Sequence, residues 1–239
     1  MVIPFDRKIC HRENDRSQRT RVAYENDGSH ARETVVQGEA DAARVLDAAD
    51  RLFNERGIQG VGMDAIRDAA DVPLKRLYRD FPSKSDLVHA VLTRRDNDVR
   101  TALARYVDDN ASTPRERVLA VFDFLYEWFS GPDFRGCLFI NTVGELGGTS
   151  DEVGRIAARH KRAVRDYLAD LVTDCALPES VADQLLIIAN GAMVTAAMHD
   201  DPEVARQARA VADILLRAAH PVGEQGNDYR RPASPRKSR

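Results

Sequence analysis

A short segment of the sequence, VPLKRLYRDFPSK at residues 72–84, concentrates positive charge and apolar side chains between two prolines. It holds four cations and one anion, although the 239-residue chain has a formal net charge of −3. Its apolar residues recur at helical spacing, so the segment is expected to form a helix with one buried side and one charged side. Such a helix has the chemistry to contact phosphates and base edges of double-stranded DNA.

The expected DNA contacts divide by residue type. Two residues one turn apart, Leu77 and Phe81, are expected to face inward and hold the helix. Lys and Arg side chains suit guanine O6 and N7, Leu suits a thymine methyl group, and a Tyr hydroxyl reaches a phosphate. The predicted DNA-binding residues are Leu74, Lys75, Arg76, Tyr78, Arg79 and Lys84. The cations also fit a plain solvated helix face, and Tyr78 also fits a packing role.

Two further helices are expected to position this segment. Apolar spacing predicts a helix near 39–56, ended by Gly57, and a second at 63–70. Asp71 lies in a turn before the third helix, 74–81, which Pro82 ends. The second and third helices have the size of a helix-turn-helix motif, whose second helix lies in the major groove of DNA.

The rest of the chain also shows helical spacing and no alternating strand pattern. Helices are expected at 84–110, 114–129, 137–146, 151–175, 178–199 and 203–219. The predicted fold class is all-α with about nine helices, in which a three-helix head precedes a larger ligand-binding and dimerisation domain. The predicted boundaries are 1–36 (disordered extension), 37–84 (head), 85–219 (helical domain) and 220–239 (basic disordered tail).

The string GIQGVGMDAIRDAADVPLKRLYRDFPSKSDL, from Gly57 to Leu87, resembles the DNA-binding region of the tetracycline-repressor (TetR) family of bacterial regulators. The Leu-Tyr pair at 77–78, Phe81 and the Ser-Lys pair at 83–84 carry the resemblance. The chain departs from the family at Val61-Gly62, where a Ser or Thr cap is usual, and at Asp71, where Gly is usual. The start of the third helix differs as well, so the resemblance implies a familiar scaffold with a changed reading surface.

The resemblance implies a small-molecule pocket in the helical domain, where aromatic residues are frequent. The predicted ligand-binding residues are Phe122, Tyr126, Phe129, Phe139 and Asn141. Aromatic residues at helical spacing more often form a plain core, and an amide on an apolar helix is equally typical of a satisfied core group.

The last two helices carry stripes of apolar and small residues that favour close packing of helices between two subunits. The predicted dimer interface is Ile188, Ala192, Ala196, Val204, Ala208, Val211 and Leu215. The alternative is that these stripes pack within one chain. A two-fold dimer would match a palindromic operator.

The remaining composition limits the other function classes. Three scattered cysteines and the lack of a signal sequence or an apolar run of membrane length predict a cytoplasmic protein without membrane contact. Six dispersed histidines and no Glu-x-x-His pair, HExxH motif or Gly-rich phosphate loop predict no metal, no cofactor and no enzyme. Cys137, two residues from Arg135, raises the hypothesis of a thiol sensor.

The sequence therefore predicts a ligand-responsive DNA-binding transcriptional regulator, a repressor that binds its operator as a homodimer and releases it on binding a small-molecule effector. Two alternatives remain. One is a redox or electrophile sensor acting through Cys137. The other is a helical interaction protein that no longer binds DNA, because residues 40–90 hold eight cations and nine anions.

Overall fold

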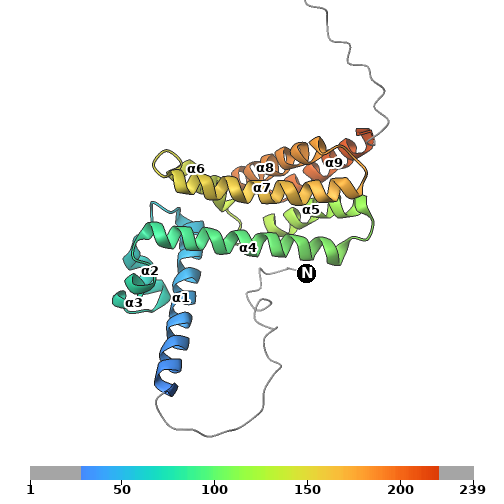
Figure 1. Ribbon diagram of the computed structural model, residues 1–239. Coiled ribbons are helices and arrows are strands. Elements are labelled where there is room, and N and C mark those ends of the chain that lie inside the picture. The colour runs from blue at the N-terminus through green and yellow to red at the C-terminus, as the bar shows by residue number, and fades with distance from the viewer. Residues whose placement is uncertain (1–27, 221–239) are drawn as a thin grey trace, which may run out of the picture.

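The structure, a computed structural model, describes residues 28–220. This part of the chain forms nine helices and no strand, which confirms the predicted all-α class. The helices are α1 (Gly28–Arg56), α2 (Met63–Ala70), α3 (Leu74–Asp80), α4 (Lys84–Asn110), α5 (Pro114–Phe129), α6 (Leu138–Leu146), α7 (Asp151–Asp174), α8 (Ser180–His199) and α9 (Glu203–Ala218). Helices α1 to α3 form a small head, α5 to α9 form a larger body, and α4 runs from one to the other (Figure 1).

The helix starts follow the capping residues in the sequence. The Ser83 hydroxyl accepts the N–H of Asp86 at 3.1 Å and so caps α4. Thr113 and Glu116 form a complete capping box at the start of α5. Ser150 caps α7 by accepting the N–H of Val153. Local chemistry therefore sets the starts of three long helices, α4 between head and body and α5 and α7 in the body.

Helix α1 differs most from its prediction. It begins at Gly28 rather than near residue 39, so the helix includes residues 28–36 of the predicted extension. The N-terminal half of α1 extends beyond the rest of the head (Figure 1). Apolar residues repeat at helical spacing only where a helix packs on a neighbouring element. The N-terminal half of α1 lacks this repeat, so it was not predicted as a helix. The rest of the extension and the predicted basic tail from residue 221 lie outside the described residues.

A core of apolar side chains from α1, α2, α3 and the start of α4 holds the head together. Its most deeply buried members are Val45, Leu52, Phe53, Val61, Ile66, Leu77 and Leu87. Burial of one such aliphatic or aromatic side chain contributes about 1.5–3 kcal/mol. The two short helices of the head, α2 and α3, therefore depend on α1 and α4 for their stability.

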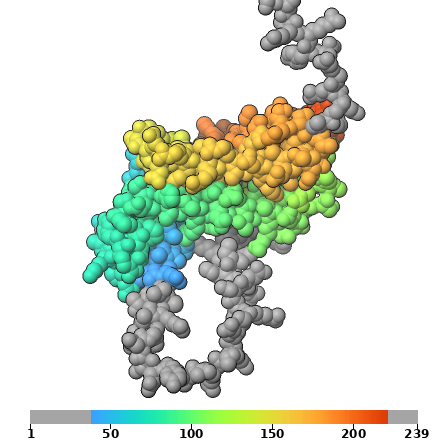
Figure 2. All heavy atoms as spheres, viewed as in Figure 1, coloured from blue at the N-terminus to red at the C-terminus, as the bar shows by residue number. Residues whose placement is uncertain are grey.

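In the body, α7 lies along α4 over much of the molecule's length (Figure 2). Helix α8 packs against α7 and α9. By length and composition alone α8 is apolar enough to cross a membrane, which the sequence reading did not anticipate. Its apolar character has a second explanation, because a row of its side chains from Val181 to Ala196 is buried against the rest of the body.

Loss of the α5 cap gives a first prediction. Thr113→Ala is expected to lower the free energy of unfolding by about 0.5–2 kcal/mol, because the N–H of Glu116 loses its acceptor. Urea unfolding at fixed protein concentration measures the change. Thr93→Ala, at an exposed position within α4, is the control and is expected to change little.

Candidate nucleic-acid interface

The turn between α2 and α3 has the backbone that its sequence predicts. Asp71 adopts the left-handed conformation, with φ 51° and ψ 55°, where the TetR family often has Gly. Asp tolerates this region better than most residues because its short polar side chain bonds locally. Gly62 precedes α2 and gives no side-chain cap, so that departure from the family leaves α2 uncapped. The two helices nevertheless form the predicted helix-turn-helix.

Helix α3 separates its buried and exposed residues as predicted. Leu77 is 1% exposed and Phe81, which follows the helix, is 7% exposed, so both anchor α3 to the head. Leu74 and Tyr78 are about half exposed, although both are large and apolar over most of their surface. Exposed apolar side chains beside a cation suit contact with base edges and sugars.

The cations of α3 are not equally available. Lys75 is exposed and makes no ion pair with the side chains that the structure describes, those of residues 38–220. Arg76 donates from Nη1 to Oδ2 of Asp41 on α1 at 2.5 Å. Arg79 donates two hydrogen bonds to Asp80, at 2.7 and 2.9 Å, and these raise its pKa. The sequence predicted three free cations, whereas two of them have carboxylate partners.

Lys84 is the remaining predicted DNA contact. It is the first residue of α4, half-buried, and lies directly after the Ser83 cap. The first-turn N–H groups and the dipole of α4 favour an anion at this end. Asp86 in the same turn offsets part of that charge. The predicted contacts thus lie on α3 and at the start of α4.

Besides the continuous helix α4, two residue pairs in the described part of the chain join head and body by hydrogen bonds: Gln59 with Glu145 and Asn54 with Asp133. Neither pair was predicted. The side chain of Glu145 on α6 accepts the backbone N–H of Gln59 at 2.9 Å, and its carbonyl accepts the Gln59 amide. Gly57 has φ 75°, and a Cβ there would lie 2.9 Å from Glu145 Oε1. Asn54 donates to the carbonyl of Asp133 at 2.8 Å. The α1–α2 corner is therefore fixed to the α6 end of the body.

A buried histidine joins α4, α6 and α7. His160 is 4% exposed, its ring stacks on Phe139 at 3.8 Å, and its Nδ1 lies 2.7 Å from Oδ1 of Asp96. Burial lowers the pKa of His160, and Asp96 opposes this only in part. Burial alone would raise the pKa of Asp96, but hydrogen bonds from Arg100 and His160 hold it below its ordinary value. In sequence the signal was a histidine on the apolar stripe of α7.

This histidine predicts a pH dependence. Burial in the folded chain lowers the pKa of His160, whereas in the unfolded chain the imidazole has its ordinary pKa of 6.5. The unfolded state therefore binds more protons below that pH, and the free energy of unfolding is expected to fall as pH drops from about 6.5. His160→Gln should flatten this dependence in urea titrations at pH 7.5 and 5.5. The exposed control His199→Gln should leave it intact.

The predicted ligand-binding residues lie mostly in the core. Phe122, Phe129 and Phe139 are at most 5% exposed. The Tyr126 ring is covered by the guanidinium of Arg206 on α9, 3.9 Å from the ring centroid. Asn141 is exposed and donates to a backbone carbonyl at 3.0 Å, so it is not a core amide, and its contact with a ligand stays a prediction.

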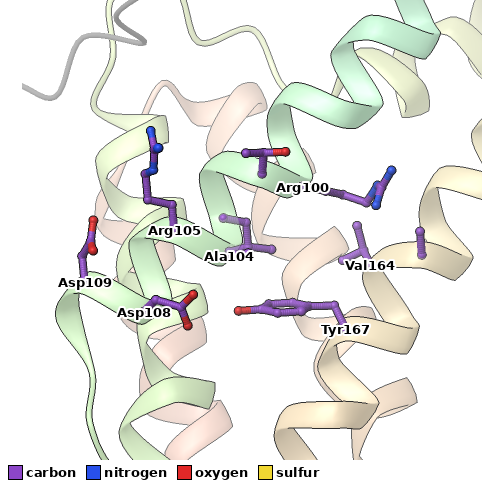
Figure 3. Close-up of a pocket in the computed structure, with 10 residues that line it drawn as sticks. Arg100, Ala104, Arg105, Asp108, Asp109, Val164 and Tyr167 are labelled. Atoms are coloured by element: carbon purple, nitrogen blue, oxygen red, sulfur yellow. The ribbon is translucent and has the colours of Figure 1, made fainter. Parts of the chain in front are cut away.

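The structure contains a surface groove of about 530 Å³ between α4 and α7, lined by none of those five residues. Its lining is Arg100, Thr101, Leu103, Ala104, Arg105, Asp108, Asp109, Ala163, Val164 and Tyr167. Tyr167 extends from α7 with its hydroxyl directed toward Asp108 (Figure 3). That hydroxyl is buried without a hydrogen-bond partner in the described part of the chain, and burial raises its pKa.

The Cys137 thiol has a different cationic neighbour from the one predicted. Cys137 is 4% exposed and occupies the N-cap position of α6, where its side chain makes no capping hydrogen bond. Arg135 donates to the carbonyls of Pro132 and Phe134. Lys161 Nζ lies 3.6 Å from the Cys137 Sγ and also donates to an amide oxygen on α8.

The predicted dimer stripe is largely internal. Ala192, Ala196 and Ala208 are at most 8% exposed, so they pack inside the body within one chain, and their part in a dimer interface stays a prediction. Ile188, Val204 and Leu215 are half-buried, and Val211 is exposed. The large exposed apolar residues of these two helices are Ile187, Val194, Met198, Val211 and Ile214.

A protruding helix on a three-helix head, joined to a larger helical body, defines the class of helix-turn-helix DNA-binding regulators. Residues 45–91 match the family of bacterial regulatory proteins named tetR, and residues 114–212 match the tetracyclin repressor-like C-terminal domain. The chain belongs to the TetR family and is a DNA-binding transcriptional regulator.

Known relatives agree with this assignment. The HTH-type transcriptional regulator YjdC of Escherichia coli is 23% identical over 177 residues, which cover 73% of this chain and 93% of that protein. The transcriptional activator FasR of Mycolicibacterium smegmatis is 39% identical over 102 residues, 41% of this chain and 46% of that protein. The structure resembles SCO4454, a TetR-family regulator of Streptomyces coelicolor, with a TM-score of 0.70, 28% identity, and coverage of 80% of this chain and 96% of that one.

Proposed function

We propose that this regulator is a cytoplasmic repressor that binds a palindromic operator as a homodimer and releases it on binding a small molecule. The observation that carries the proposal is the division of α3, whose anchors Leu77 and Phe81 are buried while Lys75 and Tyr78 face solvent. That arrangement allows α3 to enter a major groove without unfolding the head. Two heads related by a two-fold axis would read two half-sites.

Selection of bound fragments from random DNA duplexes tests the proposal. We expect a palindromic site with half-site centres separated by about one helical turn or a multiple of it. Binding should weaken steeply with added salt, because phosphate contacts release counterions. A chain that retains no duplex at low salt would instead support the alternative of a helical interaction protein.

The groove between α4 and α7 is the candidate effector site. Its floor is apolar at Leu103, Ala104 and Val164, and the Tyr167 hydroxyl offers an unused hydrogen bond. A ligand with an apolar body and a hydrogen-bond acceptor fits these features. Because α4 continues into the head, a ligand that favours one position of α4 would shift the spacing of the two heads.

Effector binding is tested by screening small molecules for release of operator DNA. A true effector should lose affinity in Tyr167→Phe while DNA binding without effector is retained. If an effector releases DNA from Tyr167→Phe and Val164→Asp at the same concentration as from the native chain, its site lies outside the groove.

A second candidate, a thiol sensor, is favoured by the contact between Lys161 and Cys137. Reactive cysteines usually lie beside a cation, as Cys137 does, although its burial restricts access by a reagent. N-ethylmaleimide should then release operator DNA from the native chain and not from Cys137→Ser. Equal release from both proteins would exclude this mechanism.

A further inference from the structure

Asp41 is a carboxylate on the buried side of α1. It lies four residues before Val45, on the stripe that continues through Ala48 and Leu52 into the head core, and it is 1% exposed. Two arginines contact it: Arg44 of α1 at 2.7 Å and Arg76 of α3 at 2.5 Å. A buried carboxylate is retained only where cations and hydrogen bonds compensate its lost hydration.

We propose that the Asp41–Arg76 ion pair positions α3 on α1, and that Arg76 acts through this pair rather than by reading a base. The proposal rests on the proposed function in one respect, since it assumes that α3 is the helix that reads DNA. In the pair the carboxylate is 2% exposed and the arginine side chain 45%, so the arginine covers the charge on Asp41 and ends at α1.

The neighbouring arginine supports the same arrangement. Arg79 is held by Asp80, and a Cβ added to Gly38 of α1 would lie 3.3 Å from its Nη2. The Asp41 charge also raises the pKa of Arg79, after the larger effects of Asp80. Both arginines of α3 therefore lie close to α1, on the side of α3 away from Leu74.

The consequence is a smaller reading surface than the sequence indicates. Leu74, Lys75 and Tyr78 lie on one side of α3 at spacings of one, three and four residues, and all are exposed. Among residues 38–220, whose side chains the structure describes, Lys75 is the α3 cation without a carboxylate partner. We therefore assign base reading to these three residues and positioning to Asp41 and Arg76.

Hydrogen exchange of the free protein tests the positioning step without DNA. Arg76→Ala and Asp41→Asn are each expected to accelerate exchange in the 72–84 peptide about tenfold, because α3 loses its link to α1. The double variant should exchange no faster than Asp41→Asn alone, since that variant has already lost the Asp41–Arg76 pair together with the Asp41–Arg44 contact. The matched control is Lys75→Ala, which removes an unpaired cation from the same helix and should leave exchange within about twofold.

DNA binding supplies the second test, on an operator selected from random duplexes and on its single-base variants. Arg76→Ala and Asp41→Asn should lower operator affinity by similar factors, without further loss in the double variant and without changing which base pairs are preferred. Lys75→Ala should relax the preference at one base pair. Arg76→Lys, which keeps the charge, should restore part of the affinity.

The results separate the two ideas. Relaxed preference at one base pair in Arg76→Ala, with Asp41→Asn unaffected, would make Arg76 a base reader and overturn the proposal. Unchanged hydrogen exchange of the 72–84 peptide in Arg76→Ala would also overturn the proposal. If Asp41→Asn does not fold, the result for Arg76→Ala decides alone. Failure of the native chain to bind any duplex would refute the proposed function, while the exchange result would still judge the ion pair.

Discussion

Replacing Phe122 with alanine is expected to lower the free energy of unfolding by about 3–5 kcal/mol. The ring is fully buried in the middle of α5, the helix that packs against α4, α7, α8 and α9. Truncation removes the transfer free energy of the ring and leaves a cavity that rigid neighbouring helices cannot close. Urea unfolding measured at fixed protein concentration gives the change.

The control for this prediction lies on the same helix. Phe124 is only partly buried and makes an edge contact with Tyr106 at 5.6 Å between ring centroids. Phe124→Ala should cost clearly less than Phe122→Ala, because less of its ring leaves water on folding. If Phe122→Ala lowered the free energy of unfolding by less than about 1 kcal/mol and also abolished the effector response, Phe122 would instead be a residue of the ligand pocket.

The helix starts and the buried anchors of α3 show which features local sequence patterns can predict. Capping residues, prolines and glycines are local signals, so Ser83, Thr113 and Ser150 marked helix starts that the structure confirms. The inward spacing of Leu77 and Phe81 was also readable, because a helix that packs on a core repeats its apolar residues every turn. These signals depend only on neighbours in sequence.

The ion pairs were beyond such signals. Arg76 meets Asp41 across 35 positions of sequence, and His160 meets Asp96 across 64. The spacing of residues along one helix shows on which side of that helix a charged side chain lies. It does not show which charged side chain of another helix lies opposite. The one available hint was that Asp41 and His160 occupy positions in otherwise apolar stripes.

The buried and exposed sides of α8 could not be distinguished from the sequence, for a different reason. Helix α8 is apolar on almost every side, so its period does not distinguish the side that packs inside the chain from the side that faces outward. The stripe from Ile188 through Ala196 proved mostly internal, while Ile187 and Met198 are 70% and 77% exposed. The aromatic residues of α5 presented the same ambiguity between core and pocket.

The exposed face of α8 and α9 carries the second large effect. Ile187, Met198 and Ile214 are each at least 66% exposed, an unusual concentration for a surface that stays in water. The occupant we infer is a second copy of this chain, because a two-fold pair of α8–α9 surfaces forms a four-helix bundle and places two heads on one duplex. Ile214→Glu is expected to convert the dimer to a monomer, because the interface would bury an unpaired charge twice.

Sedimentation equilibrium measures that change directly, and operator affinity should fall by about 100-fold or more because each head then binds its half-site alone. Val143→Glu is the matched control, since it places the same charge on an exposed valine of α6. A variant that sediments as a dimer with unchanged affinity would remove the α8–α9 face from the interface. A monomer that still binds the full operator like the native chain would instead show that the two heads do not act together.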